Sequence, residues 1–209
     1  MIDNLIGGES RASSSGRSQP IFNPATGEAI EELGLSGAAD VDEAVAVAKA
    51  AFPAWSRLPP MKRAAVMFRF NTLLEARADD VARAISREHG KTHADALGEV
   101  QRGKEVVEFC CGIPQLLKGE FSKNVGPEID SWSDRQALGV CAGITPFNFP
   151  AMVPLRAFAT RITLGRRAGV PCVARWHEGE ASRAVRSLVG QGCVCGWNDG
   201  SPVNREVHA

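Results

Sequence analysis

The sequence predicts an α/β fold, in which short β segments come first, several helices follow, and one buried strand comes late in the chain. Apolar residues recur at helical spacing between residues 40 and 114, where capping residues and prolines bound the segments. Residues 138–144 form an uncharged apolar run, which is typical of a strand buried on both faces. Helices combined with such a strand predict the α/β class.

Two β segments are expected near the N-terminus. Residues 5–9 predict a short strand that enters a turn. Residues 21–28 contain an Asn-Pro turn signal followed by Thr-Gly, as a hairpin connection does. We therefore expect residues 29–35 to form the second strand of this hairpin.

The first two helices have clear boundary signals. Asp40 is a good N-cap, and Glu43 three residues later completes a pair that resembles a capping box. We expect this helix to end at Pro53, because proline lacks the backbone N–H that a helix interior requires. Pro60 then stands where the first turn of a second helix tolerates proline.

Two more helices are expected before Pro114. The third stops near Gly90, a residue type that is favoured directly after a helix. Thr92 and Asp95 start the fourth, because these side chains can cap its free amides. Three basic side chains around this junction are expected to cap or solvate a helix end: His89, Lys91 and His93.

The buried strand leads into a segment suited to ligand binding. Residues 145–150 cannot continue the strand because two prolines and an asparagine mark a loop, and residues 151–154 suit the first turn of a helix. Open α/β sheets bind ligands at such a place, outside the carboxyl end of a strand. The sequence contains no G-x-G-x-x-G motif, so a nucleotide site does not follow from that fingerprint.

Composition limits the function classes. The 209 residues include 24 Lys and Arg and 24 Asp and Glu, which gives zero net charge. Nucleic-acid-binding proteins usually carry a basic surplus, so we expect no nucleic-acid partner. No apolar run is long enough to span a bilayer, and residues 1–20 do not resemble a secretory signal. We expect no membrane partner, and a cytoplasmic location, or the mitochondrial matrix if the source is eukaryotic.

The zero net charge is a cancellation between two parts of the chain. Residues 1–154 hold 16 basic and 20 acidic side chains, whereas residues 155–209 hold 8 basic and 4 acidic ones. All eight basic residues after residue 154 are arginine. The six cysteines are expected to be reduced thiols. We predict no metal site, because the spacing of the conceivable ligands fits no standard zinc finger: Cys172, His177, Cys193 and Cys195.

Residues 143–150, Gly-Ile-Thr-Pro-Phe-Asn-Phe-Pro, resemble the cofactor-loop motif of the aldehyde dehydrogenase superfamily. The wider context is most similar to its CoA-acylating methylmalonate-semialdehyde branch, and the similarity is continuous over about residues 5–155. The resemblance implies an incomplete Rossmann-type NAD-binding domain over residues 1–154, with N-terminal β segments and helices. Supporting motifs lie at residues 22–28, 52–55, 88–92, 102–108, 112–114 and 119–121.

The resemblance also implies a reaction, the NAD-dependent oxidation of methylmalonate or malonate semialdehyde with CoA as the co-substrate that takes up the acyl group. It implies Asn148 as an oxyanion donor, Thr145 and Phe147 as NAD contacts, and Arg102 as the anchor for the substrate carboxylate. From the residues alone, Asn148 also fits a loop residue that bonds its own backbone, and Arg102 a solvated cation. Thr145 and Phe147 also fit ordinary loop and core positions. The resemblance further implies assembly as a homodimer or homotetramer.

After residue 154 the family pattern breaks. The expected strand ending in Lys-Pro-Ser-Glu is absent, and neither Cys193 nor Cys195 has the flanks of the family's catalytic cysteine. We interpret residues 155–209 as an unmatched arginine-rich tail, frameshifted or disordered, and expect this chain to be an inactive truncated form. Three alternatives remain open: a hydrolytic aldehyde dehydrogenase of other specificity, a non-catalytic fragment that associates with full-length subunits, and a Cys/His metal-binding tail on a degenerate scaffold.

Overall fold

Two antiparallel hairpins begin the chain in the computed structural model, which describes residues 1–164 and 173–175. β1 (Asn4–Ile6) pairs with β2 (Glu9–Arg11). β3 (Ser18–Phe22) pairs with β4 (Ala29–Gly34). The predicted N-terminal strand and the predicted hairpin are both confirmed.

The helices follow, and most of their boundaries agree with the local sequence signals. Pro60 is the first residue of the second helix, and Gly90 ends the third in the left-handed conformation. The Thr92 hydroxyl accepts the N–H of Asp95 at 3.2 Å and caps the fourth helix, as predicted. The helices of the described residues are α1 (Ala38–Arg57), α2 (Pro60–Ala76), α3 (Ala78–His89), α4 (His93–Cys111), α5 (Ile113–Leu116) and α6 (Met152–Leu164).

The start of α1 differs from the prediction. Gly37 is its N-cap, so Asp40 lies in the first turn and is not the N-cap. The Asp40 carboxylate accepts the N–H of Gly37 at 2.7 Å and that of Ser14 at 2.9 Å, and these hydrogen bonds lower its pKa from 3.8 to about 2. Glu43 pairs instead with Arg11 of β2. The helix starts earlier because the Asp40 carboxylate reaches back to the N-cap amide.

The end of α1 also differs, because Pro53 does not stop the helix. The helix continues through Pro53 to Arg57. Trp55 lies just beyond the proline, is 3% exposed and belongs to the hydrophobic core. Proline removes one helical hydrogen bond, and burial of the indole holds the last turn in place despite that loss.

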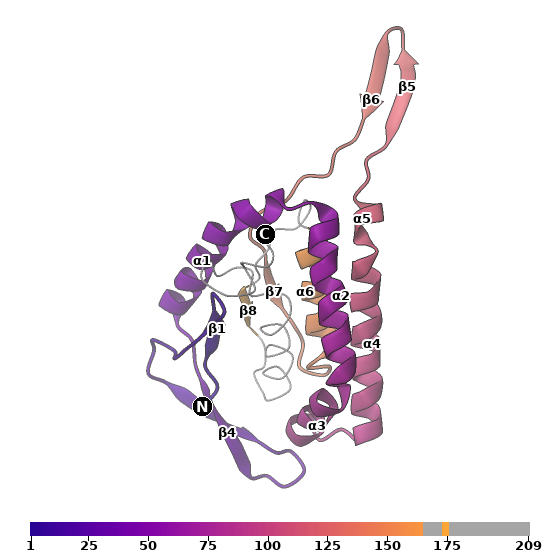
Figure 1. Cartoon of the computed structure of the whole chain (residues 1–209). Helices are drawn as coiled ribbons and strands as arrows, with labels where there is room; N and C mark the ends of the chain where they lie inside the picture. The colour runs from indigo at the N-terminus through magenta and orange to yellow at the C-terminus, as the bar shows by residue number, and fades with distance from the viewer. Residues whose placement is uncertain (165–172, 176–209) are drawn as a thin grey trace.

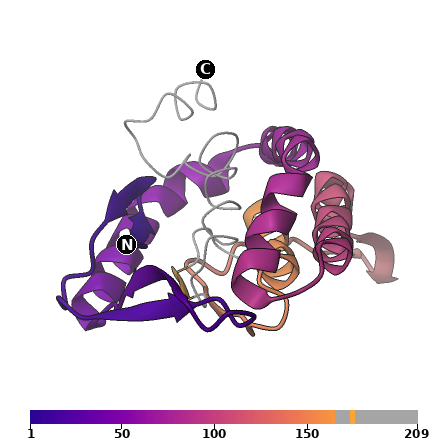
Figure 2. The same ribbon diagram turned by 90° about the horizontal axis from the view of Figure 1, so that it is seen from below.

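The hydrophobic core lies among α2, α3, α4 and α6. Figures 1 and 2 show α4 beside both α2 and α6 from two directions, and α3 crosses the lower end of this group. Aliphatic side chains fill the space between these helices. The core includes Val66, Met67, Leu74, Val81, Ile85, Val100, Val107, Ala151, Leu155 and Ala159.

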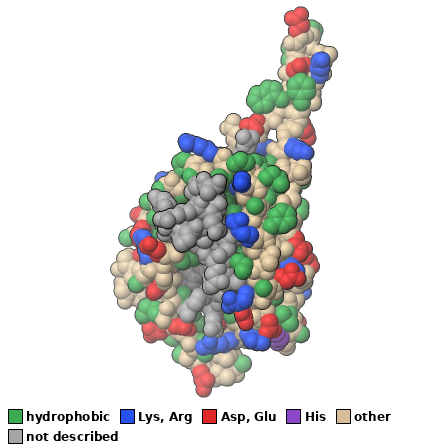
Figure 3. Space-filling model, in the orientation of Figure 1, with side chains coloured by type: hydrophobic (Ala, Val, Ile, Leu, Met, Phe, Trp, Pro, Cys, Tyr) green, Lys and Arg blue, Asp and Glu red, His purple; other side chains and the backbone are tan. Residues whose placement is uncertain are grey.

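A hairpin projects from the helices after α5 (Figure 1). Its strands, β5 (Phe121–Gly126) and β6 (Ile129–Trp132), pair antiparallel. Apolar side chains are visible on this projection in Figure 3. The exposed large ones are Phe121, Val125, Ile129 and Trp132. The sequence patterns did not predict this hairpin.

The predicted buried strand is shorter than the apolar run that predicted it. β7 (Ala142–Ile144) covers the last three residues of that run and pairs in parallel with β8 (Val173–Arg175). Gly139 has a φ of +98°, which takes the chain out of the extended conformation, and Leu138 is 78% exposed. Burial on both faces over all of residues 138–144 is therefore wrong.

Helix α6 follows β7 after a short loop and runs across the predicted domain boundary at residue 154. That boundary stays a prediction, and most of the predicted tail lies outside the described residues. In the described part of the chain, no helix is both long enough and apolar enough to cross a bilayer.

Candidate functional site

The loop between β7 and α6 holds three of the four predicted site residues. Thr145 is buried, with 7% of its surface exposed, whereas Phe147 and Asn148 are exposed. The loop starts at the carboxyl end of a parallel strand, the position at which α/β sheets place ligands. The structure therefore presents Phe147 and Asn148 at the surface and uses Thr145 at the base of the loop.

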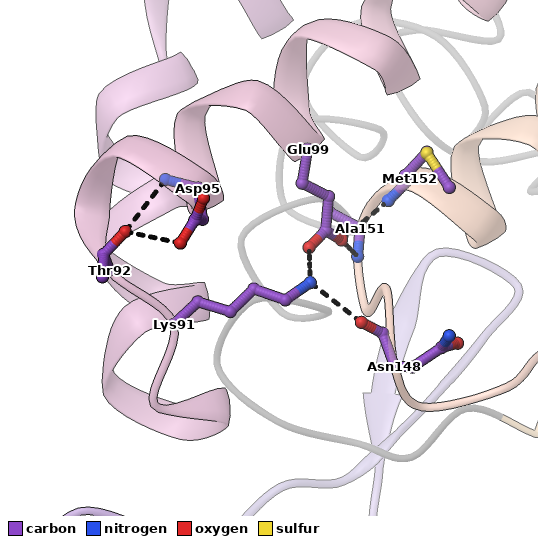
Figure 4. Close-up of polar contacts among 7 residues, drawn as sticks. All are labelled: Lys91, Thr92, Asp95, Glu99, Asn148, Ala151 and Met152. Atoms are coloured by element: carbon purple, nitrogen blue, oxygen red, sulfur yellow. Dashed lines mark hydrogen bonds and ion pairs between the residues drawn. The ribbon is translucent and has the colours of Figure 1, made fainter.

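A buried carboxylate from another helix holds the far end of this loop. Glu99 lies early in α4, with 1% of its side chain exposed. Its Oε1 accepts the N–H of Ala151 at 2.8 Å and that of Met152 at 3.1 Å (Figure 4). Amides at a helix N-terminus have no partner within the helix, and the helix dipole favours negative charge there. Glu99 therefore caps α6.

Lys91 pairs with Glu99 and reaches the middle of the loop. Its Nζ lies 2.6 Å from Glu99 Oε2 and donates to the backbone carbonyl of Asn148 at 2.8 Å. The same ammonium lies 4.1 Å from the centroid of the Phe149 ring, a cation–π contact. The Lys91 side chain is only 17% exposed. Through its pairing with Glu99, Lys91 links α4 to the loop, a different role from the predicted capping or solvation of a helix end.

The backbone and the side chain of Asn148 face opposite ways. Figure 4 shows its carbonyl directed at Lys91 and its side-chain amide directed away from the Lys91–Glu99 pair. The amide NH₂ group carries two hydrogen-bond donors. The loop is thus held at Asn148 through its backbone carbonyl, and the side-chain amide takes no part in that contact.

Arg102 lies on α4 just beyond Glu99, on the exposed surface of the helix. None of the hydrogen bonds or ion pairs among the described residues involves its guanidinium. The structure therefore places Arg102 on the helix that caps the loop, without a hydrogen bond from Arg102 to the described loop residues.

Helices α4 and α6 approach each other closely beside these residues. A Cβ atom on Gly103 would lie 2.5 Å from Leu155 Cδ1 and 3.4 Å from Met152 Cα. Leu155 is buried in the core and has little room to move. The absence of a side chain at Gly103 lets the first turn of α6 rest against α4, which brings the Met152 amide to Glu99.

Two histidines lie near the start of α4. His93 Nε2 lies 2.8 Å from Asp79 Oδ1 of α3 and links the two helices. Burial, and then the Lys91 ammonium, lower the pKa of His89. Both effects favour a neutral imidazole close to the Lys91–Glu99 pair.

The described residues offer no evident metal centre. Within residues 1–164 and 173–175, no group of three or more His, Cys, Asp and Glu side chains is placed to hold a metal ion. The cysteines of this part are not joined in disulfides: Cys110, Cys111 and Cys141. The ligands considered for a metal-binding tail lie outside the described residues: Cys172, His177, Cys193 and Cys195.

Comparison with known families gives one family model over most of the chain. The model of the aldehyde dehydrogenase family matches residues 11–168. The chain is 53% identical over 164 residues to a malonate-semialdehyde dehydrogenase of Pseudomonas aeruginosa, covering 78% of this chain and 33% of that protein. It is 43% identical over 164 residues to the mitochondrial, acylating methylmalonate-semialdehyde dehydrogenase of Arabidopsis thaliana, covering 78% and 27%.

Solved structures of the same kind superpose well. The methylmalonate-semialdehyde dehydrogenase of Oceanimonas doudoroffii has a TM-score of 0.84 and 48% identity, covering 91% of this chain and 38% of that one. A putative methylmalonate-semialdehyde dehydrogenase of Sinorhizobium meliloti, crystallised with NAD, has a TM-score of 0.83 and 43% identity, covering 90% and 38%. The chain thus spans about a third of the length of the curated relatives that it matches.

Proposed function

The chain belongs to the aldehyde dehydrogenase family, and from this membership we propose that its parent reaction is the NAD-dependent, CoA-acylating oxidation of malonate or methylmalonate semialdehyde. The names of its relatives support the substrate class. The acylating outcome is supported by the word "acylating" in the name of the Arabidopsis relative. Because the chain spans a third of such a relative, the activity of a whole subunit is proposed and not assigned to these residues alone.

The direction of the Asn148 side-chain amide is the observation that carries the proposal. When a nucleophile attacks an aldehyde, the carbonyl oxygen becomes negatively charged and needs hydrogen-bond donors that are already in position. The Asn148 backbone is anchored by Lys91 while its amide faces outward. We assign the oxyanion-donor role to this amide.

The loop also suits the predicted NAD contacts. The exposed Phe147 ring and the backbone at the end of β7 fit a cofactor lying outside the carboxyl end of the strand. When bound there, NAD supplies the hydride acceptor. Phe147 provides the exposed contact surface, and Thr145 supports it from the base of the loop. CoA as the acyl acceptor follows from the proposed reaction.

Arg102 is the proposed anchor for the substrate carboxylate. A guanidinium binds a carboxylate through two parallel hydrogen bonds, a geometry that lysine cannot reproduce. Arg102 is exposed, and none of the ion pairs among the described residues occupies it. In an active enzyme, Arg102→Lys should raise KM for a semialdehyde that carries a carboxylate and leave KM for a simple aldehyde unchanged.

We further propose that these 209 residues do not complete the reaction by themselves. The sequence after residue 154 lacks lysine and carries neither the expected Lys-Pro-Ser-Glu strand nor the expected flanks of a catalytic cysteine. A nucleophilic thiolate needs a lowered pKa and a fixed position opposite the oxyanion donors. Sequencing the coding region around residue 155 tests the frameshift interpretation: a shifted frame that encodes the family continuation supports it, and a continuous gene contradicts it.

A chimaera tests the function of residues 1–154. In it, these residues are followed by the remainder of the Pseudomonas malonate-semialdehyde dehydrogenase. We expect NADH formation from malonate or methylmalonate semialdehyde only when CoA is present, and none from the 209-residue chain. Asn148→Ala should lower kcat by roughly 10²–10³, the usual cost of losing an oxyanion donor. An exposed control, Gln101→Ala on α4, should leave kcat unchanged.

Three results would contradict the proposal. NADH formation without CoA favours the hydrolytic alternative. Turnover by the 209-residue chain alone refutes its inactivity. Full activity of the Asn148→Ala chimaera refutes the oxyanion assignment.

A non-catalytic role through association with full-length subunits is the second candidate, and the β5–β6 hairpin favours it. This hairpin projects from the helices and exposes four large apolar side chains (Figure 3). Exposed apolar patches of this kind mark protein interaction sites. Co-expression with a tagged full-length relative should recover this chain in the complex, and removal of the hairpin's apolar side chains should abolish the recovery.

A further inference from the structure

Helix α6 starts where a strand–loop–helix unit commonly binds a phosphate. The free amides at such a helix N-terminus bind anions readily. In this chain Glu99 Oε1 already accepts the amides of Ala151 and Met152. A carboxylate from α4 therefore takes the place of an external anion at this helix end.

The second oxygen of Glu99 connects this cap to the loop. Oε2 lies 2.6 Å from Lys91 Nζ. The same Nζ donates a hydrogen bond to the Asn148 carbonyl and makes a cation–π contact with the Phe149 ring. A lysine ammonium has three donors, so it can serve two oxygen acceptors at once. One ion pair thus fixes the loop at Asn148 and at the start of α6.

We propose that Lys91 and Glu99 are positioning residues that hold the loop of residues 145–151 and thereby set the direction of the Asn148 amide. Neither residue touches the reacting atoms. Asn148 follows the backbone, because its carbonyl is tied to Lys91 and its side chain then extends from the opposite side. The importance of that direction for catalysis rests on the proposed function, whereas the holding of the loop does not.

Hydrogen exchange measured by mass spectrometry on the full 209-residue chain tests the proposal without substrate or cofactor. Lys91→Met removes the ammonium and keeps the aliphatic stem. We expect peptides covering residues 145–153 to exchange about tenfold or more faster, the scale of one lost charge-assisted hydrogen bond. Peptides from α2 and α3 should change much less. Lys91→Arg, which retains the charge and the donors, should restore most of the protection.

Lys104→Met is the matched control. Lys104 lies on α4 and is 15% exposed, close to the 17% of Lys91, but it pairs with Glu75 and Glu108 away from the loop. Removal of this ammonium should leave exchange of the loop unchanged. An equal effect of Lys104→Met and Lys91→Met on the loop would overturn the proposal.

Lys91→Met leaves Glu99 without its partner and could unfold the chain, so a double variant separates folding from positioning. Lys91→Met with Glu99→Gln removes both charges, retains an amide oxygen to accept from α6, and loses the tie to Asn148. Faster exchange confined to residues 145–149 supports the proposal. Exchange that is unchanged in the loop, or faster to the same degree throughout the chain, refutes it. A chimaera that lacks activity while these exchange results hold would contradict the proposed function alone.

Discussion

The helical core and the β5–β6 hairpin use apolar side chains in opposite ways. Ile85 of α3 is completely buried, whereas Ile129 of β6 is 57% exposed. Burying an aliphatic side chain contributes about 1.5–3 kcal/mol to the free energy of unfolding. The core therefore provides most of the stability, and the apolar residues of the hairpin contribute little to it.

The difference shows where function can be placed on this chain. Lys91 and Glu99 attach the Asn148 loop to the stable region, so the helical core restrains the backbone of the loop. The hairpin extends away from that region (Figure 1), so its apolar surface suits contact with another chain. Variants in the two regions should therefore affect different measurements.

The largest effect on the free energy of unfolding is expected from truncating the buried isoleucine, Ile85, and the exposed isoleucine, Ile129, serves as its comparison. Ile85→Ala should lower the free energy of unfolding by about 2–5 kcal/mol, because it removes buried contacts and leaves a cavity. Ile129→Ala should change it by at most about 0.5 kcal/mol, as at other exposed positions. Urea unfolding followed by circular dichroism measures both. Similar losses for the two variants would break the distinction between the regions.

A smaller effect should show how tightly the core is packed beside the candidate site. Gly103→Ala should lower the free energy of unfolding by about 1 kcal/mol, because the strain of overpacking against Leu155 exceeds the gain in helix propensity. Gly98→Ala, five residues earlier on α4, meets nothing within 4 Å. It should therefore stabilise the chain by about 0.5–1 kcal/mol. Effects of the same sign would show that α4 and α6 are not closely packed there.

Local signals predict the starts of α2 and α4 and the end of α3 correctly, and distant contacts explain most of what they miss at the candidate site. Thr92 caps α4 through Asp95, only three residues away, so the sequence was sufficient. Lys91 reaches a carbonyl 57 residues later, and Glu99 reaches an amide 52 residues later. No periodicity or capping rule reports such a pair. The available signal was a glutamate, Glu99, one helical turn before a helical glycine, Gly103, and it becomes informative only once α6 is known to pack there.

The errors in α1 and β7 have both local and distant causes. Asp40 is predicted to be the N-cap of its own helix, but its carboxylate accepts the Gly37 N–H three residues earlier and also the N–H of Ser14 from the preceding segment. The apolar run at residues 138–144 predicted a longer strand, but Gly139 turns the backbone and only the last three residues pair with β8. The placement of Asn148 in the loop after that strand was correct because the proline and asparagine signals are local.

The Asp40 carboxylate at the start of α1 should make the free energy of unfolding depend on pH. Its folded pKa of about 2 lies below the ordinary 3.8, so its contribution to stability is complete above the ordinary value. That contribution should be lost as the pH falls from 3.8 to about 2. In Asp40→Asn, the fall in unfolding free energy over this pH range should be smaller than in the wild-type chain. Asp42→Asn, an exposed change on the same helix, should retain the wild-type pH dependence.

The smallest effect on stability is expected from the hairpin itself. The double variant Phe121→Ser and Trp132→Ser removes two exposed rings that face each other across the β5–β6 pair. Its urea midpoint should shift only slightly, because the change in unfolding free energy is at most about 0.5–1 kcal/mol, the scale of one cross-strand pair. Its self-association, measured by sedimentation velocity over a range of concentrations, should fall. Phe68→Ser on α2 removes another exposed ring, 56% exposed against 65% for Phe121 and 72% for Trp132, and should leave association unchanged. If Phe68→Ser reduces association as strongly, nonspecific contacts of exposed aromatic rings explain the association, and the hairpin does not.

If the double variant instead unfolds the chain, the hairpin is part of the stable region and the contrast with the core fails.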